Sequence, residues 1–260
     1  MKPITVTPAP GEAPYIVAHR GISAKAPENT IAAFRLAVET PGIDIIELDV
    51  RLSRDEEVIV LHDRTLQRTT TGNGAARNYT LAELKQFDAG SWFHPRFSAE
   101  RIPTLHEVFQ TVQDTRWVDI EIKSDFLHRE APGFLERRVL ETVKEVGVAD
   151  RVMYSSFDHR QMANIKRMEP RAITGVIYNV YRDLGRLPSK LTGRVGASLF
   201  VCAKHELTRA MIRDAHEHGI PLCIYTLNSV ADVQKILSVG IQGIISDNAD
   251  DIVRIVKQFR

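Results

Sequence analysis

The sequence predicts an α/β fold: a (β/α)8 TIM barrel with a small cap insertion after a hairpin at the second strand. Short β-rich runs alternate with helical patterns along all 260 residues, as in βαβ units that build a parallel sheet. This length is usual for one such barrel. Because no linker or composition break divides the chain, we expect a flexible N-terminal segment (1–14) followed by one barrel domain (15–260).

Nine runs have the composition of strands, whereas the barrel needs eight. They are 15–19, 44–50, 58–62, 117–123, 151–157, 172–178, 197–202, 221–226 and 243–247. The segment SRDEE between the second and third runs is too short for a parallel crossover but long enough for a hairpin. We therefore expect 58–62 to fold back antiparallel on the second strand. A turn near Asp55–Glu56 would then place His62 opposite Asp49–Val50.

Apolar residues recur at helical spacing in the segments between the other strands. The expected helices are 28–39, 104–113, 134–146, 158–168, 206–218, 229–238 and 248–258. The basic segment 181–194 could cover the mouth of the barrel, and we interpret it instead as a solvated connection.

The charge balance gives no support to partners that bind through a basic surface. The 34 Lys and Arg residues nearly cancel the 33 Asp and Glu residues, leaving a net charge of +1. Nucleic acids and acidic membranes favour a basic excess, so neither is an expected partner. The N-terminal residues lack the apolar core of a signal peptide, and no later run could span a bilayer. Cytoplasmic placement without a stable membrane anchor is expected, with Cys202 and Cys223 as buried thiols.

Polar side chains stand at the ends of the predicted strands. Glu47 and Asp49 lie two residues apart on the second strand, and Glu121 and Lys123 lie two apart on 117–123. Side chains at that spacing point to the same face of a strand. Their apolar neighbours would face the helices, so both pairs face the barrel interior. Active sites of such barrels form at this carboxyl end of the strands.

Glu47, Asp49 and Glu121 would crowd three carboxylates into one mouth, where mutual repulsion would force some to protonate. One divalent cation removes this conflict. Carboxylates completed by water suit Mg²⁺ or Ca²⁺, with Mn²⁺ as a further option, better than zinc. The alternative is that each carboxylate pairs with a basic residue, as Lys123 could with Glu121. We predict the metal site because three such residues lie beside two histidines.

Two histidines end strands beside this cluster, His19 on the first strand and His62 on the hairpin. Imidazole exchanges protons near neutral pH, so one ring could accept a proton from a nucleophilic hydroxyl while the other donates to a leaving alcohol. Arg20 offers a bidentate grip on a phosphate and Lys123 a point charge for the same anion. Together these groups indicate cleavage of a phosphate ester by in-line displacement.

An ordered series of motifs over about residues 15–250 resembles the glycerophosphodiester phosphodiesterase family, which is related in fold to phosphatidylinositol-specific phospholipase C. The motifs are HRG (19–21), PENT (27–30), ELDV (47–50), HD (62–63), DAGSWF (88–93), IPTLHEVF (102–109), EIK (121–123), SSF (155–157) and YTLN (225–228). The resemblance implies hydrolysis of a small glycerophosphodiester to sn-glycerol 3-phosphate and an alcohol. Our hypothesis for the mechanism has two steps, with a cyclic phosphate as the intermediate. Residues 64–115 resemble the family's cap insertion.

Carried over by position, the resemblance implies that His19 and His62 are the catalytic pair. It implies Glu47, Asp49 and Glu121 as metal ligands and Arg20 and Lys123 as phosphate contacts.

The chain departs from the family pattern late in the sequence. Tyr225 replaces a common Trp and still offers an aromatic face to the substrate. Leu227, Gln242 and the run SDN (246–248) also differ from the common residues.

Three rival functions remain, two on the same residues and one on the glycine-containing segment 240–247. They are a lysophospholipase D-type activity on lipid phosphodiesters, a catalytically silent barrel that binds phosphodiesters, and an unrelated phosphate-binding barrel such as an isomerase. The first would need an apolar groove, the second would be free to lose a catalytic residue, and the third would leave the histidines and carboxylates unexplained. The preferred alcohol and the oligomeric state do not follow from the sequence.

Overall fold

The computed structural model describes residues 14–113, 115–124 and 133–258. Within these residues, eight parallel strands close into a barrel, because β1 pairs with both β2 and β9. The strands in order around the barrel are β1 (Tyr15–Ala18), β2 (Ile45–Leu52), β4 (Trp117–Ile122), β5 (Val152–Ser156), β6 (Ile173–Ile177), β7 (Leu199–Ala203), β8 (Leu222–Tyr225) and β9 (Gly243–Ser246). The predicted TIM barrel is confirmed.

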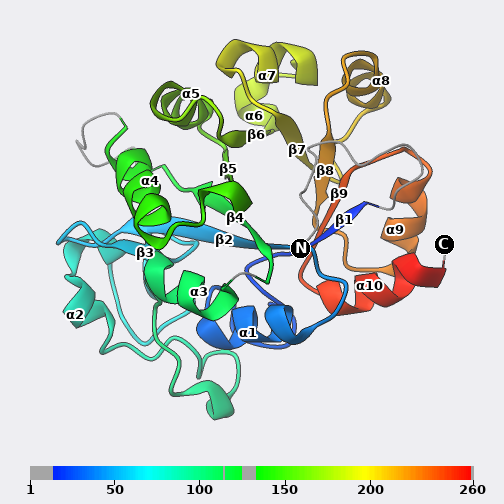
Figure 1. Cartoon of the computed structure of the whole chain (residues 1–260). Coiled ribbons are helices and arrows are strands. Elements are labelled where there is room, and N and C mark those ends of the chain that lie inside the picture. The colour runs from blue at the N-terminus through cyan, green and yellow to red at the C-terminus, as the bar shows by residue number, and fades with distance from the viewer. Residues whose placement is uncertain (1–13, 114, 125–132, 259–260) are drawn as a thin grey trace.

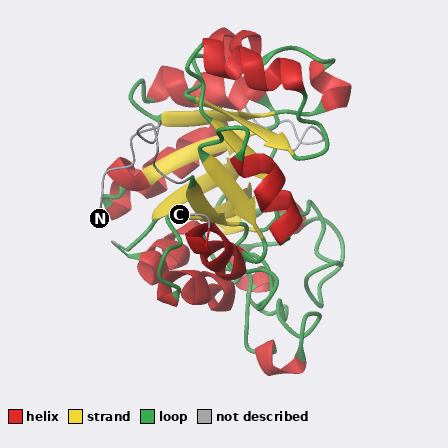
Figure 2. Ribbon diagram, turned by 90° about the vertical axis from the view of Figure 1, so that its right-hand side faces the viewer, coloured by secondary structure: helices red, strands yellow, loops and turns green. Residues whose placement is uncertain are grey.

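Helices surround the strands (Figures 1 and 2). The helices of this outer layer are α1 (Ile31–Glu39), α3 (Leu105–Val112), α4 (Phe134–Val146), α5 (His159–Met168), α7 (Pro188–Val195), α8 (Arg209–Glu217), α9 (Val230–Leu237) and α10 (Ala249–Gln258). The main apolar core lies between these helices and the outward-facing side chains of the strands. A smaller cluster that includes Val17, Ile45, Trp117, Met153 and Leu199 fills the barrel interior.

The hairpin is present, with a register that differs slightly from the prediction. β3 (Val58–Val60) pairs antiparallel with β2, with Val60 opposite Val50. The Leu61 amide donates to the Asp49 carbonyl at 2.9 Å, so Leu61 rather than His62 lies opposite Asp49. The cause is the turn, which the Ser53 amide closes by donating to the Glu57 carbonyl. That bond centres the loop on Asp55 and shifts the pairing.

The interpretation of 181–194 as a solvated connection is wrong. This region forms the short helix α6 (Val180–Asp183) and then α7, which contacts α5 and α8 in the outer layer. Leu191 and Thr192 are buried on its inner face. Basic residues on the outward face obscure this pattern in the sequence, because only a few apolar residues of the segment point inward.

The cap lies between β3 and α3 and extends beyond the ring of helices at the lower left of Figure 1. It contains the helix α2 (Leu81–Leu84) and two 3₁₀ turns, η1 (Ala76–Asn78) and η2 (Pro95–Phe97); a further turn, η3 (Ala149–Arg151), precedes β5. A separate apolar cluster, which includes Leu66, Leu84 and Ile102, holds the cap together. The last part of the predicted insertion, α3, contacts α1 and α4 as a member of the outer layer.

Candidate active site

A cavity of about 190 Å³ opens among the carboxyl ends of the strands. Its lining includes seven of the eight predicted site residues: His19, Arg20, Glu47, His62, Glu121, Lys123 and Tyr225. The eighth, Asp49, is fully buried and adjoins the cavity, since its carboxylate forms ion pairs with Arg20 and Lys123. The two-residue spacing on β2 and β4 directs these groups inward, as the strand geometry requires.

Glu47, Asp49 and Glu121 form a compact, buried carboxylate trio. One oxygen of each lies within 4.8 Å of the others. Burial and then the charge of Asp49 raise the pKa of Glu47 well above its usual value. Burial alone would raise the pKa of Asp49 also, but Lys123 and Arg20 lower it below its usual range. The trio therefore keeps one strongly anionic carboxylate beside one that resists ionisation.

The trio suits a divalent cation because its donors are carboxylate oxygens and one of these oxygens has no hydrogen-bond partner among the described residues. Glu47 Oε1 is buried and accepts no hydrogen bond among the described residues, which is a costly arrangement for a carboxylate oxygen. Its partner oxygen, Oε2, accepts from the Arg20 amide at 2.9 Å. A cluster of carboxylate oxygens that leaves one oxygen unpaired matches the oxygen ligands that Mg²⁺ and Ca²⁺ prefer.

The HRG motif makes the tight turn that brings Arg20 to this trio. Arg20 and Gly21 have φ angles of 57° and 81°, in the left-handed region. A Cβ on Gly21 would stand 2.6 Å from the Ala33 backbone, so only glycine fits where the turn passes α1. The Arg20 side chain contacts Asp49 at 3.2 Å and Glu28 at 2.7 Å.

His19 is held by a carboxylate that the sequence reasoning missed. Its Nδ1 lies 2.6 Å from Asp247 Oδ1. Asp247 also accepts hydrogen bonds from Ser23 and from Asn228. Although burial opposes ionisation, the hydrogen bond from His19 lowers the pKa of Asp247 to about 2. Asp247 belongs to the SDN run that ends the last strand, and its place at a strand end was the available signal.

His62 is held in the same way, through a chain of charges that reaches the cap. Its Nδ1 lies 2.6 Å from Asp63 Oδ1, and Asp63 pairs with Arg68 of the cap. Arg68 contacts Glu28 at 2.7 Å, and Glu28 in turn contacts Arg20. Burial lowers the pKa of His62 to about 4. Among the described residues, Nε2 of neither His19 nor His62 forms a hydrogen bond, so these atoms remain for a ligand.

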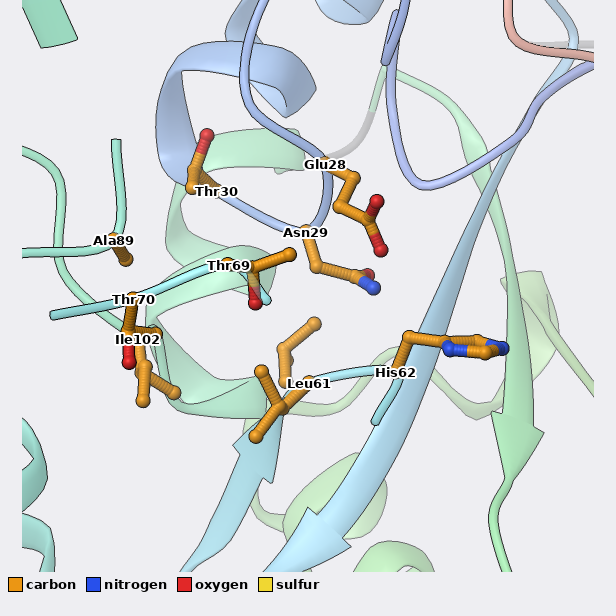
Figure 3. A pocket seen from close by; sticks show the side chains of 10 residues that line it. Glu28, Asn29, Thr30, Leu61, His62, Thr69, Thr70, Ala89 and Ile102 are labelled. Carbon is orange, nitrogen blue, oxygen red and sulfur yellow. The ribbon is translucent and has the colours of Figure 1, made fainter. Parts of the chain in front are cut away.

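The PENT loop before α1 supports the site, another role that sequence reasoning missed. Asn29 Nδ2 donates to Asp49 Oδ2 at 2.7 Å, and Thr30 caps the helix, which begins at Ile31 rather than at residue 28. Figure 3 shows Asn29 beside Thr69 of the cap, with the His62 ring directed away from Thr69 and Thr70; all four residues line one pocket. This small neighbouring pocket of about 10 Å³ has room for about one water molecule.

The rest of the cavity wall combines polar and aromatic groups. Asp119 and Ser155 line it and are joined by a 3.0 Å hydrogen bond. Burial raises the pKa of Asp119 to about 7. Phe157 and Tyr225 also line the cavity, and the Lys123 ammonium lies 5.9 Å from the centre of the Phe157 ring. Sequence reasoning had assigned no role to Asp119 or Phe157.

Comparison with known proteins decides the family. The model of the glycerophosphoryl diester phosphodiesterase family matches residues 19–251. The chain belongs to this family. A glycerophosphodiester phosphodiesterase of Caldanaerobacter subterraneus is 36% identical over 245 residues, covering 94% of this chain and 98% of the relative. The protein is therefore an enzyme of the phosphodiesterase class, as the resemblance implied.

Solved structures of the family have the same barrel. A phosphodiesterase from Oleispira antarctica, in complex with the product sn-glycerol-3-phosphate, has a TM-score of 0.85 and 28% identity, and the match covers 94% of this chain and 97% of the other. A glycerophosphodiester phosphodiesterase from Thermotoga maritima has a TM-score of 0.74 and 29% identity, covering 94% and 99% of the two chains.

Two further expectations can be compared with the structure. Cys202 and Cys223 are free thiols; Cys202 is buried as predicted, whereas Cys223 is half-buried. Burial raises the pKa of each thiol to about 12. No helix among the described residues is long and apolar enough to cross a membrane. Most of the segment 1–14 lies outside the described residues.

Proposed function

We propose that this member of the glycerophosphodiester phosphodiesterase family hydrolyses glycerophosphodiesters to sn-glycerol 3-phosphate and an alcohol, with His19 and His62 as its acid–base pair. The observation that carries the proposal is the arrangement of two histidines around one carboxylate trio. Each ring is fixed through Nδ1 by an aspartate at 2.6 Å. The Nε2 atoms are left as the proton-exchanging atoms beside a cavity of substrate size.

Glu47, Asp49 and Glu121 would hold one divalent cation, with Mg²⁺ or Ca²⁺ best matched to the donors and Mn²⁺ a further candidate. When bound, the cation would lower the pKa of a substrate hydroxyl and stabilise charge on the phosphoryl oxygens. With all three carboxylates ionised, as metal binding would require, the trio and the two cationic side chains Arg20 and Lys123 together leave one net negative charge. A divalent cation would turn this into one net positive charge, which complements a singly charged phosphodiester.

The two histidines would carry the protons through two displacements. One ring accepts the proton of the glycerol 2-hydroxyl as its oxygen attacks phosphorus, and the other donates a proton to the departing alcohol oxygen. The product of this step is a cyclic glycerol phosphate. Water then opens the ring with the two roles reversed, which returns both histidines to their starting protonation states and yields glycerol 3-phosphate.

Arg20 and Lys123 would contact the phosphate once their carboxylate partners bind the cation. Both side chains are largely buried, with exposed fractions of 17% and 10%. In the structure their positive ends pair with Asp49. A cation on the trio would take over part of this neutralisation and leave donors of both side chains for the substrate oxygens. Tyr225 would offer its aromatic face to the substrate.

The experiment is release of glycerol 3-phosphate from glycerophosphocholine and glycerophosphoethanolamine, first with EDTA and then with Mg²⁺, Ca²⁺ or Mn²⁺. We expect activity only with added metal. His19→Ala and His62→Ala should each lower turnover by about 10²–10⁴-fold while folding normally. Near-normal turnover in both variants would contradict the acid–base assignment.

The metal assignment has its own matched pair of variants. Glu121→Gln removes one charged ligand while keeping the side-chain shape, and Glu141→Gln makes the same change on the surface, where Glu141 pairs with Arg138. We expect Glu121→Gln to raise the metal concentration needed for half-maximal activity and Glu141→Gln to leave it unchanged. Equal behaviour of the two variants would refute the assignment of Glu121.

A further inference from the structure

Asp119 is a buried carboxylate inside the cavity that the proposed chemistry does not use. It is 6% exposed and lies opposite Glu47 on the neighbouring strand β4. Its Oδ1 accepts from the Ser155 hydroxyl at 3.0 Å. No described residue donates a hydrogen bond to its other oxygen, Oδ2. Because Asp119 lines the cavity, this oxygen can accept a hydrogen bond from a donor that a ligand supplies.

The cavity is closed beneath Asp119. Trp117 precedes Asp119 by two residues on the inner face of β4, and Met153 is the register partner of Asp119 on β5. Both belong to the apolar cluster that fills the barrel interior, and three further members of that cluster, Ile177, Val201 and Ile245, line the cavity itself. Phe157 follows Ser155 by two residues on the inner face, toward the carboxyl end of the strands. The cavity therefore has an apolar floor near Asp119 and an open side toward Phe157.

The closed end of the cavity suits the glycerol phosphate, which is the part of the substrate that does not vary. Every glycerophosphodiester contains the same glycerol phosphate, whereas the esterified alcohol differs in size and charge. The cavity has an accessible volume of about 190 Å³ and opens at the mouth of the barrel. Its closed end suits a compact polar group, and an acyl chain would have to leave through the mouth. The glycerol would therefore occupy the closed end and the alcohol would point to the open mouth.

We propose that Asp119, positioned by Ser155, accepts a hydrogen bond from the terminal hydroxyl of the glycerol and so selects diesters with unacylated glycerol. The inference rests on the proposed function. Neighbouring strands lie about 4.8 Å apart, and Asp119 is the register partner of Glu47. If the 2-hydroxyl of the glycerol lies at the trio, its terminal hydroxyl can therefore form a hydrogen bond with Asp119. Acylation of that hydroxyl removes the donor and adds a chain that the apolar floor would block.

The experiment compares two substrates in wild type and variants at saturating metal. The first is glycerophosphocholine, and the second is its deoxy analogue, in which hydrogen replaces the terminal hydroxyl. One hydrogen bond contributes enough that we expect wild type to prefer glycerophosphocholine by roughly 10-fold in kcat/KM. Asp119→Ala should reduce this preference to about 3-fold or less. Asp119→Asn, which keeps an acceptor oxygen, should retain more of it.

The substrate ratio separates recognition from a general loss of activity, because damage to folding or metal binding lowers both rates together. Cys223→Ala is the matched control. It alters a neighbouring interior side chain, whose thiol pKa is raised partly by Asp119, and should leave the ratio unchanged. Stabilisation of the protein against thermal unfolding by glycerol 3-phosphate, compared with propane-1,2-diol 1-phosphate, gives a readout that needs no turnover.

The outcomes distinguish the inference from the function on which it rests. Wild type that hydrolyses both substrates equally, or Asp119→Ala that keeps the full preference, would overturn the role of Asp119 and leave the proposed function standing. Cleavage of lysophosphatidylcholine at a rate comparable to glycerophosphocholine would overturn it as well. Absence of hydrolysis by wild type with every metal would overturn the proposed function and this inference with it.

Discussion

Replacement of Asp247 by asparagine tests whether a fixed imidazole is needed for turnover. The carboxylate accepts from His19 Nδ1 at 2.6 Å, and its pKa of about 2 keeps it ionised throughout any assay near neutral pH. A hydrogen bond to a charged group contributes about 1.5–3 kcal/mol. About a third of the Asp247 side chain is exposed (34%), so solvent screening favours the lower half of this range. We therefore expect kcat to fall about 10- to 30-fold.

The assay measures kcat, KM and the activating metal concentration with glycerophosphocholine. Because Asp247 is not one of the proposed ligands, the metal requirement of Asp247→Asn should match wild type. Asp232→Asn, which removes a carboxylate paired with Lys204, is the control and should retain full activity. A folded Asp247→Asn enzyme whose kcat stays within about 3-fold of wild type would refute the positioning role.

The same variant has a stability signature that is independent of catalysis. The folded-state pKa of Asp247 is about 2, below its unfolded value of about 3.9. Its contribution to stability is therefore present above about pH 4 and is lost as the pH falls toward 2. Urea unfolding at pH 7 and pH 3 should show a smaller loss of unfolding free energy in Asp247→Asn than in wild type. An identical loss would argue against the carboxylate–imidazole bond.

Three further predictions concern the turn, the thiols and the cap. Gly21→Ala should lower the free energy of unfolding by about 2–4 kcal/mol, because the new side chain combines a left-handed φ with a clash. Gly147→Ala is the control, since Gly147 has a φ of 77° and open space around its Cβ, and it should lower the free energy of unfolding by less. Equal losses of unfolding free energy in denaturant melts would contradict the clash. Cys202 is buried and should react with a thiol reagent at pH 8 only after denaturation, so its rapid modification in a native Cys223→Ala variant would contradict this burial. Arg68→Ala removes the guanidinium that pairs with Asp63, the carboxylate that holds His62, and should lower kcat by about 3- to 10-fold. Arg64→Ala is the control in the same kinetic assay and should leave kcat unchanged.

The barrel and half of the residues that line the cavity could be predicted, because each depends on local periodicity. Inward-facing polar residues at spacing of two identify Glu47, Asp49 and Glu121, and the short SRDEE connection identifies the hairpin. α7 could not be recognised as easily, since a helix with basic residues on its solvent face shows only a narrow apolar stripe. The register of the hairpin depends on one hydrogen bond across the Ser53–Glu57 turn, which no hydrophobic pattern records.

The supporting residues were missed for a different reason. Asp247 and His19 are separated by nearly the whole chain and meet only because β9 closes the barrel against β1. Asn29 reaches Asp49 because the HRG turn directs the following loop back over β2. Asp119 was visible in the strand 117–123, but its meaning depends on the closed floor beneath it. When a barrel closes, residues that are far apart in the sequence become neighbours, and the hydrophobic pattern of the sequence does not show which ones.

The cap joins the catalytic machinery through a charged contact and has an apolar cluster of its own. Arg68 is held between Asp63 and Glu28, and two more cap residues, Glu83 and Lys85, pair with Arg54 of the hairpin and Glu107 of α3. A cap of different length grafted here would need to keep charged partners at all three points. For protein engineering, the surface around the opening could then be redesigned while these contacts hold the insertion in place, and alcohol preference is the property to measure in such grafts.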